Sequence, residues 1–203
     1  MSILRERIIE AQSKEGRYFN KHTHFAEIYD EILKPYIGKE MTLVELGVSH
    51  GGSLQLWREY LGGMARIVGL DVAEHCLYNE SQIECYLVDQ SKQDDLNKIA
   101  QIAPIIDLFI DDGSHYSEDQ IATFETVFPL IKPGGIYVCE DVHTSYRELY
   151  HMGYKNPGSF IEYCKNIVDS MYKNESEQII PNTHFNMIKS IEFHFALVVI
   201  RKT

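Results

Sequence analysis

Long hydrophobic runs and cysteine pairs are both missing from this sequence. No apolar stretch approaches the roughly 18 residues of a membrane-spanning helix, and the N-terminus, Met-Ser-Ile-Leu-Arg-Glu-Arg, lacks the core of a signal peptide. The four cysteines show neither CxxC spacing nor the density of a disulfide framework. Cys85 and Cys139 lie within apolar runs, where we expect them to pack as small buried hydrophobes. These absences predict a soluble, cytoplasmic protein.

Basic residues are also scarce. The sequence has 19 Lys and Arg against 30 Asp and Glu, which gives a formal net charge of −11. A nucleic-acid backbone or an anionic membrane needs a basic patch, and no run of Lys or Arg offsets the average locally. We therefore expect neither as a partner. The acidic balance fits a small-molecule enzyme or a metal-binding protein and does not decide between them.

The length and the hydrophobic pattern predict one α/β domain over residues 1–203. An N-terminal helical segment, 1–38, holds two helices at 2–14 and 23–34. Strands and helices then alternate, as in a mostly parallel sheet covered on both faces. The expected strands are 42–46, 66–71, 83–88, 106–111, 135–140, 188–193 and 195–201. The expected helices are 52–61, 92–102, 117–131 and 159–172.

The last two expected strands are separated by so few residues that they must form a hairpin, so the final strand is antiparallel to its neighbour. A doubly wound, Rossmann-like sheet of seven strands that ends in an antiparallel hairpin is typical of the class I methyltransferase fold. Residues 142–158 follow a strand and are too irregular for a helix or strand, and 173–187 is polar and rich in Asn. We interpret 142–187, with its helix, as the side of the molecule that faces an acceptor substrate.

A glycine-rich stretch, Glu45-Leu-Gly-Val-Ser-His-Gly-Gly-Ser53, follows the first strand. Its spacing differs from the Gly-x-Gly-x-x-Gly dinucleotide fingerprint. Gly47 allows a sharp turn, and the two later glycines lie at a helix N-terminus, which favours a carboxylate or a phosphate. A tight strand-to-helix turn without a ligand explains the same residues.

Acidic and amide groups at the next two strand ends favour a nucleoside ligand. Asp71 ends the second strand, where ribose hydroxyls lie in nucleoside-binding sheets. Asp89 and Gln90 end the third strand, where an adenine edge would fall. S-adenosylmethionine is the ligand that fits these groups best, with Glu45, Gly47 and Ser53 as further candidate contacts.

Two acidic pairs, Asp111-Asp112 and Glu140-Asp141, each end a strongly apolar run. Strand ends gather at one edge of a parallel sheet, and four carboxylates there repel one another unless a cation is present. Oxygen ligands favour Mg2+, Mn2+ or Ca2+ over zinc. Acids that cap helices or lie solvated in loops would give the same pattern, so the metal site remains one of two interpretations of these residues.

Three further residues are candidates for the chemistry. His115 follows Asp112 by three residues, where an imidazole beside a metal-bound hydroxyl could act as a general base or make an ordinary polar contact. His143 and Tyr146 either line the acceptor pocket or are ordinary loop residues. The pattern alone supports both interpretations of each.

The sequence resembles the macrocin/mycinamicin-type sugar O-methyltransferases over about 20–146. The motifs that carry the resemblance are Glu-Leu-Gly-Val-Ser-His-Gly-Gly-Ser-Leu-x-x-Trp57, Ile-Asp-Asp-Gly-Ser-His115 and Phe-Pro-Leu-Ile-Lys-Pro-Gly-Gly-Ile-Tyr-Val-Cys-Glu-Asp-Val-His-Thr-Ser-Tyr146. The second motif and the end of the third are specific when they occur together. The stretch 147–187 matches no pattern that identifies an acceptor.

The resemblance implies a Mg2+-dependent (or Mn2+-dependent) methyl transfer from S-adenosylmethionine to a sugar hydroxyl. It implies that Asp112, Glu140 and Asp141 hold the metal and that His115 is the base. Our own hypothesis adds that Asp111 faces the cofactor. The sugar is carried by a natural product, a nucleotide or a polysaccharide. There are two alternatives to this function: a catechol or phenol O-methyltransferase, and a non-catalytic S-adenosylmethionine-binding protein. The N-terminal helices either contact another subunit of a homo-oligomer or cover their own sheet.

Overall fold

The described part of the chain forms a seven-stranded sheet, in the order β3-β2-β1-β4-β5-β7-β6. The computed structural model describes residues 3–13 and 21–203, and the chain divides into two compact units, Met1–Asp89 and Gln90–Thr203. The strands are β1 Met41–Leu46, β2 Ala65–Asp71, β3 Ile83–Leu87, β4 Ile106–Asp111, β5 Ile131–Glu140, β6 Ile188–His194 and β7 Leu197–Lys202. The predicted α/β class is confirmed, and the predicted single domain stays a prediction.

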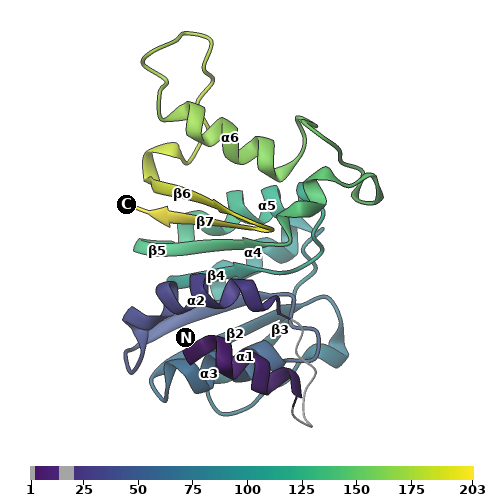
Figure 1. Ribbon diagram of the computed structural model, residues 1–203, viewed down its shortest axis with the longest axis vertical. Helices are drawn as coiled ribbons and strands as arrows, with labels where there is room; N and C mark the ends of the chain where they lie inside the picture. The colour runs from purple at the N-terminus through teal and green to yellow at the C-terminus, as the bar shows by residue number, and fades with distance from the viewer. Residues whose placement is uncertain (1–2, 14–20) are drawn as a thin grey trace. The chain divides into compact units, whose positions relative to one another are not determined.

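In the described residues of the first unit, three α-helices accompany three parallel strands. The helices are α1 Ile3–Ser13, α2 Ala26–Leu33 and α3 Gly52–Leu61, and β2 pairs in parallel with both β1 and β3. α1 contacts both α2 and α3 (Figure 1). α3 approaches β2 so closely that a Cβ on Gly69 would lie 2.7 Å from Leu54 Cδ1, so a larger residue there would require neighbouring side chains to shift. The loop between β1 and α3 is therefore held against the strands by packing.

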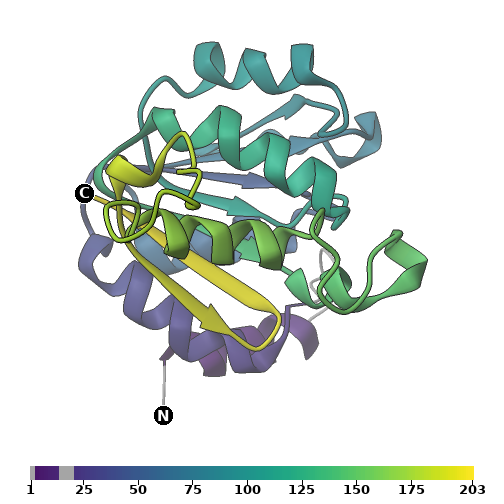
Figure 2. The ribbon, with the colours of Figure 1, turned by 90° about the horizontal axis from the view of Figure 1, so that it is seen from above.

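In the second unit, three α-helices accompany the other four strands. The helices are α4 Gln93–Ile102, α5 Ser117–Val127 and α6 Phe160–Ser170, and α5 lies between α4 and α6 (Figure 2). β4 and β5 are parallel, whereas β7 is antiparallel to both β5 and β6. The predicted C-terminal hairpin is confirmed, and a two-residue turn with Ala196 at φ 59° closes it.

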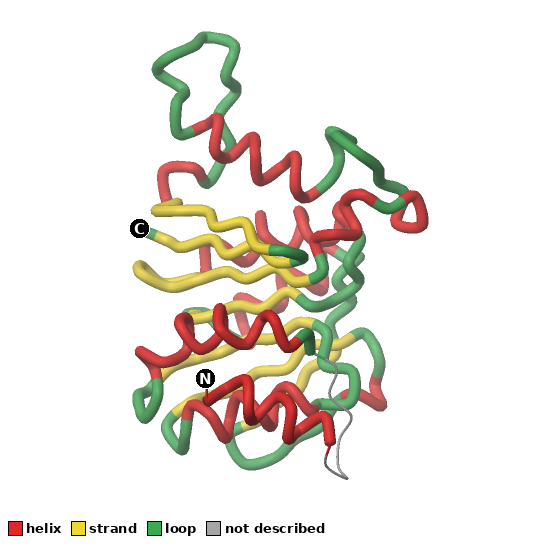
Figure 3. The backbone as a smooth tube through the Cα atoms, viewed as in Figure 1, coloured by secondary structure: helices red, strands yellow, loops and turns green. Residues whose placement is uncertain are grey.

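Several predicted boundaries differ from those of the structure. The helix expected over 117–131 ends at Val127, because a 3-10 helix with Pro129 follows and Ile131 already begins β5. The segment 142–158, expected to have no regular structure, contains 3-10 helices at Val142–Tyr146 and Glu148–Tyr150. The segment 173–187 is a loop that ends in a short 3-10 helix (Figure 3). Residues 2 and 14 of the first expected helix lie outside the described residues.

The core follows the predicted apolar pattern in most places. Leu4 and Ile8 of α1 are buried, whereas Ile9, expected on the same stripe, is half-exposed. Cys85 and Cys139 are buried as predicted, and all four cysteines are free thiols. Across 3–13 and 21–203, no helix combines the length and the apolarity that are required to cross a bilayer.

Candidate functional site

The glycine-rich loop of the first unit is shaped by the carboxylate of Asp71. Its Oδ2 accepts hydrogen bonds from the backbone N–H groups of Val48 at 2.9 Å and Ser49 at 3.0 Å. Its Oδ1 accepts a third from Ala73 at 2.9 Å. Gly47 and Gly51 of this loop have φ of 93° and 76°, in the region that favours glycine. Asp71 therefore orders the loop, and its predicted contact with a ribose stays a prediction.

Glu45, the first residue of the glycine-rich stretch, is completely buried. Its carboxylate pairs with Lys21 Nζ at 3.1 Å and accepts a hydrogen bond from the indole N–H of Trp57 at 2.9 Å. The Lys21 ammonium also lies over the rings of Tyr29 and Trp57, at 5.8 Å from each centroid. These partners join the end of β1 to the helices, and a direct contact of Glu45 with a cofactor stays a prediction.

In the second unit, Gln90 and Asp111 belong to one buried hydrogen-bond network. The Gln90 amide nitrogen donates to Asp111 Oδ1 at 2.8 Å, and its oxygen accepts from the Ser114 N–H at 2.8 Å. The Tyr137 hydroxyl donates to Asp111 Oδ2 at 2.8 Å. Burial raises the pKa of the Asp111 carboxyl to about 7, although these hydrogen bonds oppose that shift. Both side chains support the loop after β4.

Ser53 lies in the first turn of α3, and Asp89 follows β3 at the end of the first unit. Their roles, and those of Gln90 and Asp111, as cofactor contacts stay predictions.

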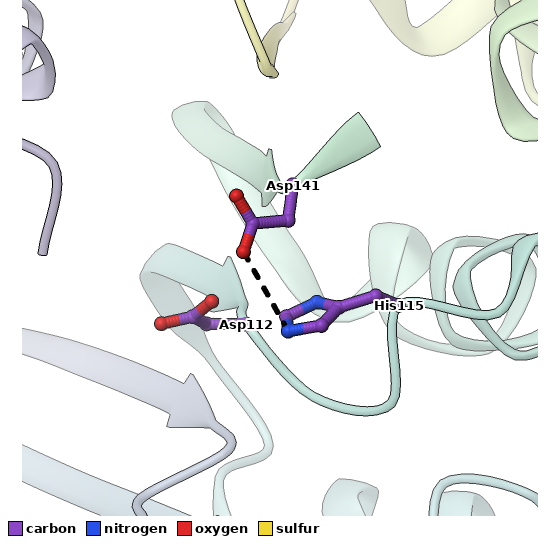
Figure 4. A group of neighbouring side chains, drawn as sticks. All are labelled: Asp112, His115 and Asp141. Carbon is purple, nitrogen blue, oxygen red and sulfur yellow. Dashed lines mark ion pairs between the residues drawn. The ribbon is translucent and has the colours of Figure 1, made fainter. Parts of the chain in front are cut away.

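Three candidate residues of the second unit converge on one point. Single ligand atoms of Asp112, His115 and Asp141 all lie within 4.8 Å of one another. Figure 4 shows the three side chains turned toward the same space. Asp112 and His115 come from the loop after β4, and Asp141 directly follows β5. His115 Nε2 lies 3.7 Å from Asp141 Oδ2, and each of these two side chains is 24% exposed, so the group is reachable from solvent.

Two members of this cluster have unusual backbone conformations. His115 and Asp141 have φ of 61° and 54°, in the left-handed region that non-glycine residues adopt at an energetic cost of roughly 1–2 kcal/mol each. The Thr144 hydroxyl lies 2.8 Å from the His115 carbonyl and 3.0 Å from the Asp141 carbonyl, so it links the two loops. Backbone strain of this kind gathers at functional sites, because other contacts must maintain it.

The remaining site candidates lie close to the cluster in sequence. Glu140 is buried at the end of β5, and its backbone carbonyl accepts a hydrogen bond from the Gln120 amide at 3.3 Å. The cluster contains His115 and does not contain Glu140, whose role as a metal ligand stays a prediction. His143 Nδ1 lies 3.6 Å from Asp141 Oδ1, and Tyr146 is half-exposed.

His143 and Tyr146 also line a cavity of about 300 Å3. Sequence reasoning missed the other walls of this cavity, which come from α6 and from the β6–β7 hairpin. Ile161 and Lys165 belong to α6, and Phe193 and Phe195 to the hairpin. The one sequence signal was a pair of phenylalanines beside a hairpin turn, which also occurs in strands that pack on a core.

Known proteins match this chain both in sequence and in structure. Residues 44–142 match a family described as "Methyltransferase domain". A tetracenomycin rhamnosyl 2'-O-methyltransferase of Streptomyces olivaceus is 33% identical over 162 residues, which cover 76% of this chain and 42% of that protein. The demethylmacrocin O-methyltransferase of Streptomyces fradiae is 31% identical, over 74% of this chain and 40% of that protein.

The chain carries a methyltransferase domain. Its fold matches the MycE methyltransferase of mycinamycin biosynthesis, crystallised with Mg and SAH, with a TM-score of 0.83 and 25% identity over 99% of this chain and 54% of that one. The resemblance to macrocin and mycinamicin methyltransferases is confirmed. The chain spans about two fifths of the length of these curated relatives and about half of the solved structure.

Proposed function

We propose that the chain transfers a methyl group from S-adenosylmethionine to a hydroxyl group of a sugar, in a reaction that depends on Mg2+ or Mn2+. The convergence of Asp112, His115 and Asp141 at one point carries this proposal. The relatives support it, because their names describe O-methyltransferases that act on demethylmacrocin and on a rhamnosyl tetracenomycin. MycE supports it further, since it was crystallised with Mg, SAH and Mycinamycin VI.

The donor atoms of the cluster fit a hard divalent cation. Two carboxylates, those of Asp112 and Asp141, supply oxygen ligands from different loops, and a ring nitrogen of His115 lies within 4.8 Å of them. We assign Asp112 and Asp141 as metal ligands, with the buried Glu140 as a third candidate. When bound, Mg2+ or Mn2+ would act as a Lewis acid that lowers the pKa of an acceptor hydroxyl and orients it.

His115 is the residue that we assign to remove the proton of the acceptor hydroxyl. Its imidazole Nε2 lies 3.7 Å from Asp141 Oδ2, so the ring stands beside the ligands that would orient the hydroxyl. The link from Thr144 to the His115 carbonyl fixes the backbone of this loop. Because the methyl group of a sulfonium is already activated, the residues of the domain contribute mainly by positioning the reactants.

The glycine-rich loop is the segment that we assign to S-adenosylmethionine. The N-terminus of α3 offers backbone N–H groups to the methionine carboxylate, beside Gly47 and Ser53. Asp71 and Asp89 are assigned to the nucleoside. Glu45, Gln90 and Asp111 are fully or nearly fully buried, so we assign them to support these groups.

Methyl-labelled S-adenosylmethionine tests the function directly. We would incubate the protein with sugar glycosides, nucleotide sugars and catechols, with Mg2+ or with EDTA. EDTA-sensitive labelling of a sugar is the expected result. Labelling of catechols alone would contradict the proposal and identify the rival enzyme. Tight binding of S-adenosylmethionine with no labelled acceptor would favour a non-catalytic binding protein.

A matched pair of variants makes this experiment specific to the cluster. Asp112→Asn should abolish labelling while cofactor affinity stays nearly unchanged, because the variant loses one metal ligand. Asp94→Asn removes an exposed carboxylate from the first turn of α4 and should leave labelling unchanged. Equal activity of the two variants would refute the metal assignment.

A further inference from the structure

The helices of the first unit, α1, α2 and α3, border another cavity, of about 190 Å3 (Figure 1). One side chain from each helix and two from the turn after α2 line it, namely Arg7, Asp30, Tyr60, Lys34 and Ile37. Most ligand pockets have roughly 300–1,000 Å3, so an occupant of this smaller cavity is a molecule of few atoms.

This cavity is separate from the glycine-rich loop. α3 begins at Gly52, directly after that loop, whereas Tyr60 lies in its last turn. An α-helix rises about 1.5 Å per residue, so the ten residues of α3 span about 15 Å. None of the residues that line the cavity is one that we assign to the cofactor or the metal. A ligand bound here would therefore occupy a site of its own.

Tyr60 holds the carboxylate that lines the cavity. Its hydroxyl donates a hydrogen bond to Asp30 Oδ1 at 2.5 Å, and the tyrosine is only 6% exposed. Burial, together with this bond, raises the pKa of the Tyr60 hydroxyl, so it stays a neutral donor. Asp30 Oδ2 accepts no hydrogen bond from the described residues. This second oxygen is therefore available to a cationic donor.

Two basic side chains of the cavity form no ion pair with a described carboxylate. Lys34 follows Asp30 by four residues, a spacing that favours an ion pair on a helix, but Asp30 is bonded to Tyr60 instead. The Arg7 guanidinium carbon lies 5.9 Å from the centroid of the Tyr60 ring. Acids outnumber basic residues by 30 to 19 in this sequence, so two cations without an acidic partner at one cavity are unexpected. They offer donors to a carboxylate.

The five side chains match the groups of an aliphatic amino acid. Arg7 and Lys34 suit its carboxylate, and Asp30 Oδ2 suits its ammonium group. Ile37, which is 47% exposed, suits an aliphatic side chain. A phosphate dianion fits less well, because the Asp30 carboxylate repels it and Ile37 stays uncovered.

We propose that this cavity binds a small, zwitterionic aliphatic amino acid, at a site distinct from those of the cofactor and the metal. The inference goes beyond the proposed function and does not depend on it. The cavity contributes one acceptor and two cationic donors, so a ligand that carries both charges gains more than one that carries either alone.

The test compares L-leucine with 4-methylpentanoate, which lacks the ammonium group, with 3-methylbutylamine, which lacks the carboxylate, and with inorganic phosphate. Affinities for the full chain are measured by calorimetry and saturation-transfer NMR, in EDTA. We expect L-leucine to bind about tenfold more tightly than each of the other probes. Equal or tighter binding of any other probe, or no binding of L-leucine at millimolar concentration, would overturn the proposal.

Substitutions of the lining residues locate the binding. Arg7→Gln should weaken L-leucine binding about tenfold and Lys34→Gln about threefold, because Lys34 is more exposed. Asp30→Asn still accepts the Tyr60 hydroxyl but should remove the preference for L-leucine over 4-methylpentanoate. Lys39→Gln removes an exposed lysine outside the cavity and should leave the affinity unchanged. Equal losses in Lys34→Gln and Lys39→Gln would show a general effect of charge and refute the site.

Competition with S-adenosylhomocysteine separates this site from that of the cofactor. That molecule carries an amino-acid group of its own, which L-leucine resembles. We expect saturating S-adenosylhomocysteine to leave the affinity for L-leucine unchanged. Displacement of L-leucine would overturn the proposal, because the amino acid would then bind at the cofactor site. These measurements require no methyl transfer, so failure of the proposed function would not alter their outcome.

Discussion

At the scale of single residues, the backbone of His115 is the strongest sign of its role. A histidine with φ of 61° needs other contacts to hold it, and Thr144 supplies one to its carbonyl. We expect His115→Gln to lower kcat by about 100-fold to 10,000-fold, because glutamine can donate and accept hydrogen bonds but cannot take a proton. The measurement is the pH profile of kcat at saturating Mg2+.

The same variant separates a base from a metal ligand. Loss of a base should remove the rise of kcat with pH and leave the Mg2+ concentration needed for half-maximal activity unchanged. If excess Mg2+ restores the activity of His115→Gln, the histidine holds the metal and the assigned proton transfer is wrong.

Asp111, buried beside the cluster, gives a pH-dependent stability. Its pKa is about 7 in the folded protein and about 3.9 in an unfolded chain. Because the folded-state pKa is raised, this group stabilises the fold fully below pH 4, and that contribution is lost as the pH rises through 7. The loss is on the order of 4 kcal/mol for three pKa units. Asp111→Asn should abolish this part of the pH dependence.

The measurement for Asp111 is the free energy of unfolding in urea at pH 5 and pH 8, in EDTA. The change in the free energy of unfolding from pH 5 to pH 8 is compared between the wild type and the variant. A general destabilisation by the substitution affects both pH values equally and cancels. Identical differences in the two proteins would contradict the assignment of this titration to Asp111.

At the scale of elements, Lys202 of β7 holds the segment after α5 against the sheet by hydrogen bonds. Its buried ammonium donates hydrogen bonds to the carbonyls of Phe128 at 3.1 Å, Pro129 at 3.0 Å and Ile131 at 2.5 Å. Lys202→Met keeps most of the apolar volume but leaves these carbonyls without that donor. We expect a loss of about 1–3 kcal/mol in the free energy of unfolding, measured by denaturant titration.

The control for Lys202 is Lys189→Met, which removes an exposed lysine from the neighbouring strand β6. Its stability should stay within about 0.5 kcal/mol of the wild type, as for most surface substitutions. A similar loss in both variants would show that net charge, and not the hydrogen bonds of Lys202, accounts for the effect.

Elements with a strongly apolar pattern could be predicted from the sequence. β4 was predicted with its observed bounds, because every residue in it is buried. β5 begins four residues before its predicted start, because Lys-Pro-Gly-Gly resembles a turn. The structure accommodates it with an irregular register opposite β4 and with Gly134 at φ 77°. Local sequence does not reveal that the neighbouring strand β4 can pair with β5 despite such a shift in register.

The acidic pairs show what sequence reasoning could and could not reach in the site. Strand-end positions predicted that Asp112 and Asp141 would approach one another, and they do. In each pair, however, the first acid is buried in the strand end, because successive strand residues point in opposite directions. The aromatic cavity could not be predicted, since it joins α6 to a hairpin that lies about 30 residues later in the sequence.

At the scale of the whole molecule, a bound cation should stabilise the fold of a strongly acidic protein. The net charge of −11 includes carboxylates that the fold holds within a few ångströms of one another. A ligand that binds only the folded state stabilises it by about 2.7 kcal/mol at a concentration 100 times its Kd. We expect millimolar Mg2+ to raise the Tm of the wild type by roughly 5–10 °C.

This shift should depend on the cluster and not on the general acidity of the surface. Asp112→Asn should lose the Mg2+-dependent rise in Tm, whereas Asp94→Asn should keep it, although both substitutions remove one negative charge. Scans with Mn2+ and with Ca2+ would rank the cations, because the site selects them by ligand number and flexibility. An equal rise in both variants would mean that Mg2+ acts by screening surface charge, and the metal assignment would then fail without reference to any assay of methyl transfer.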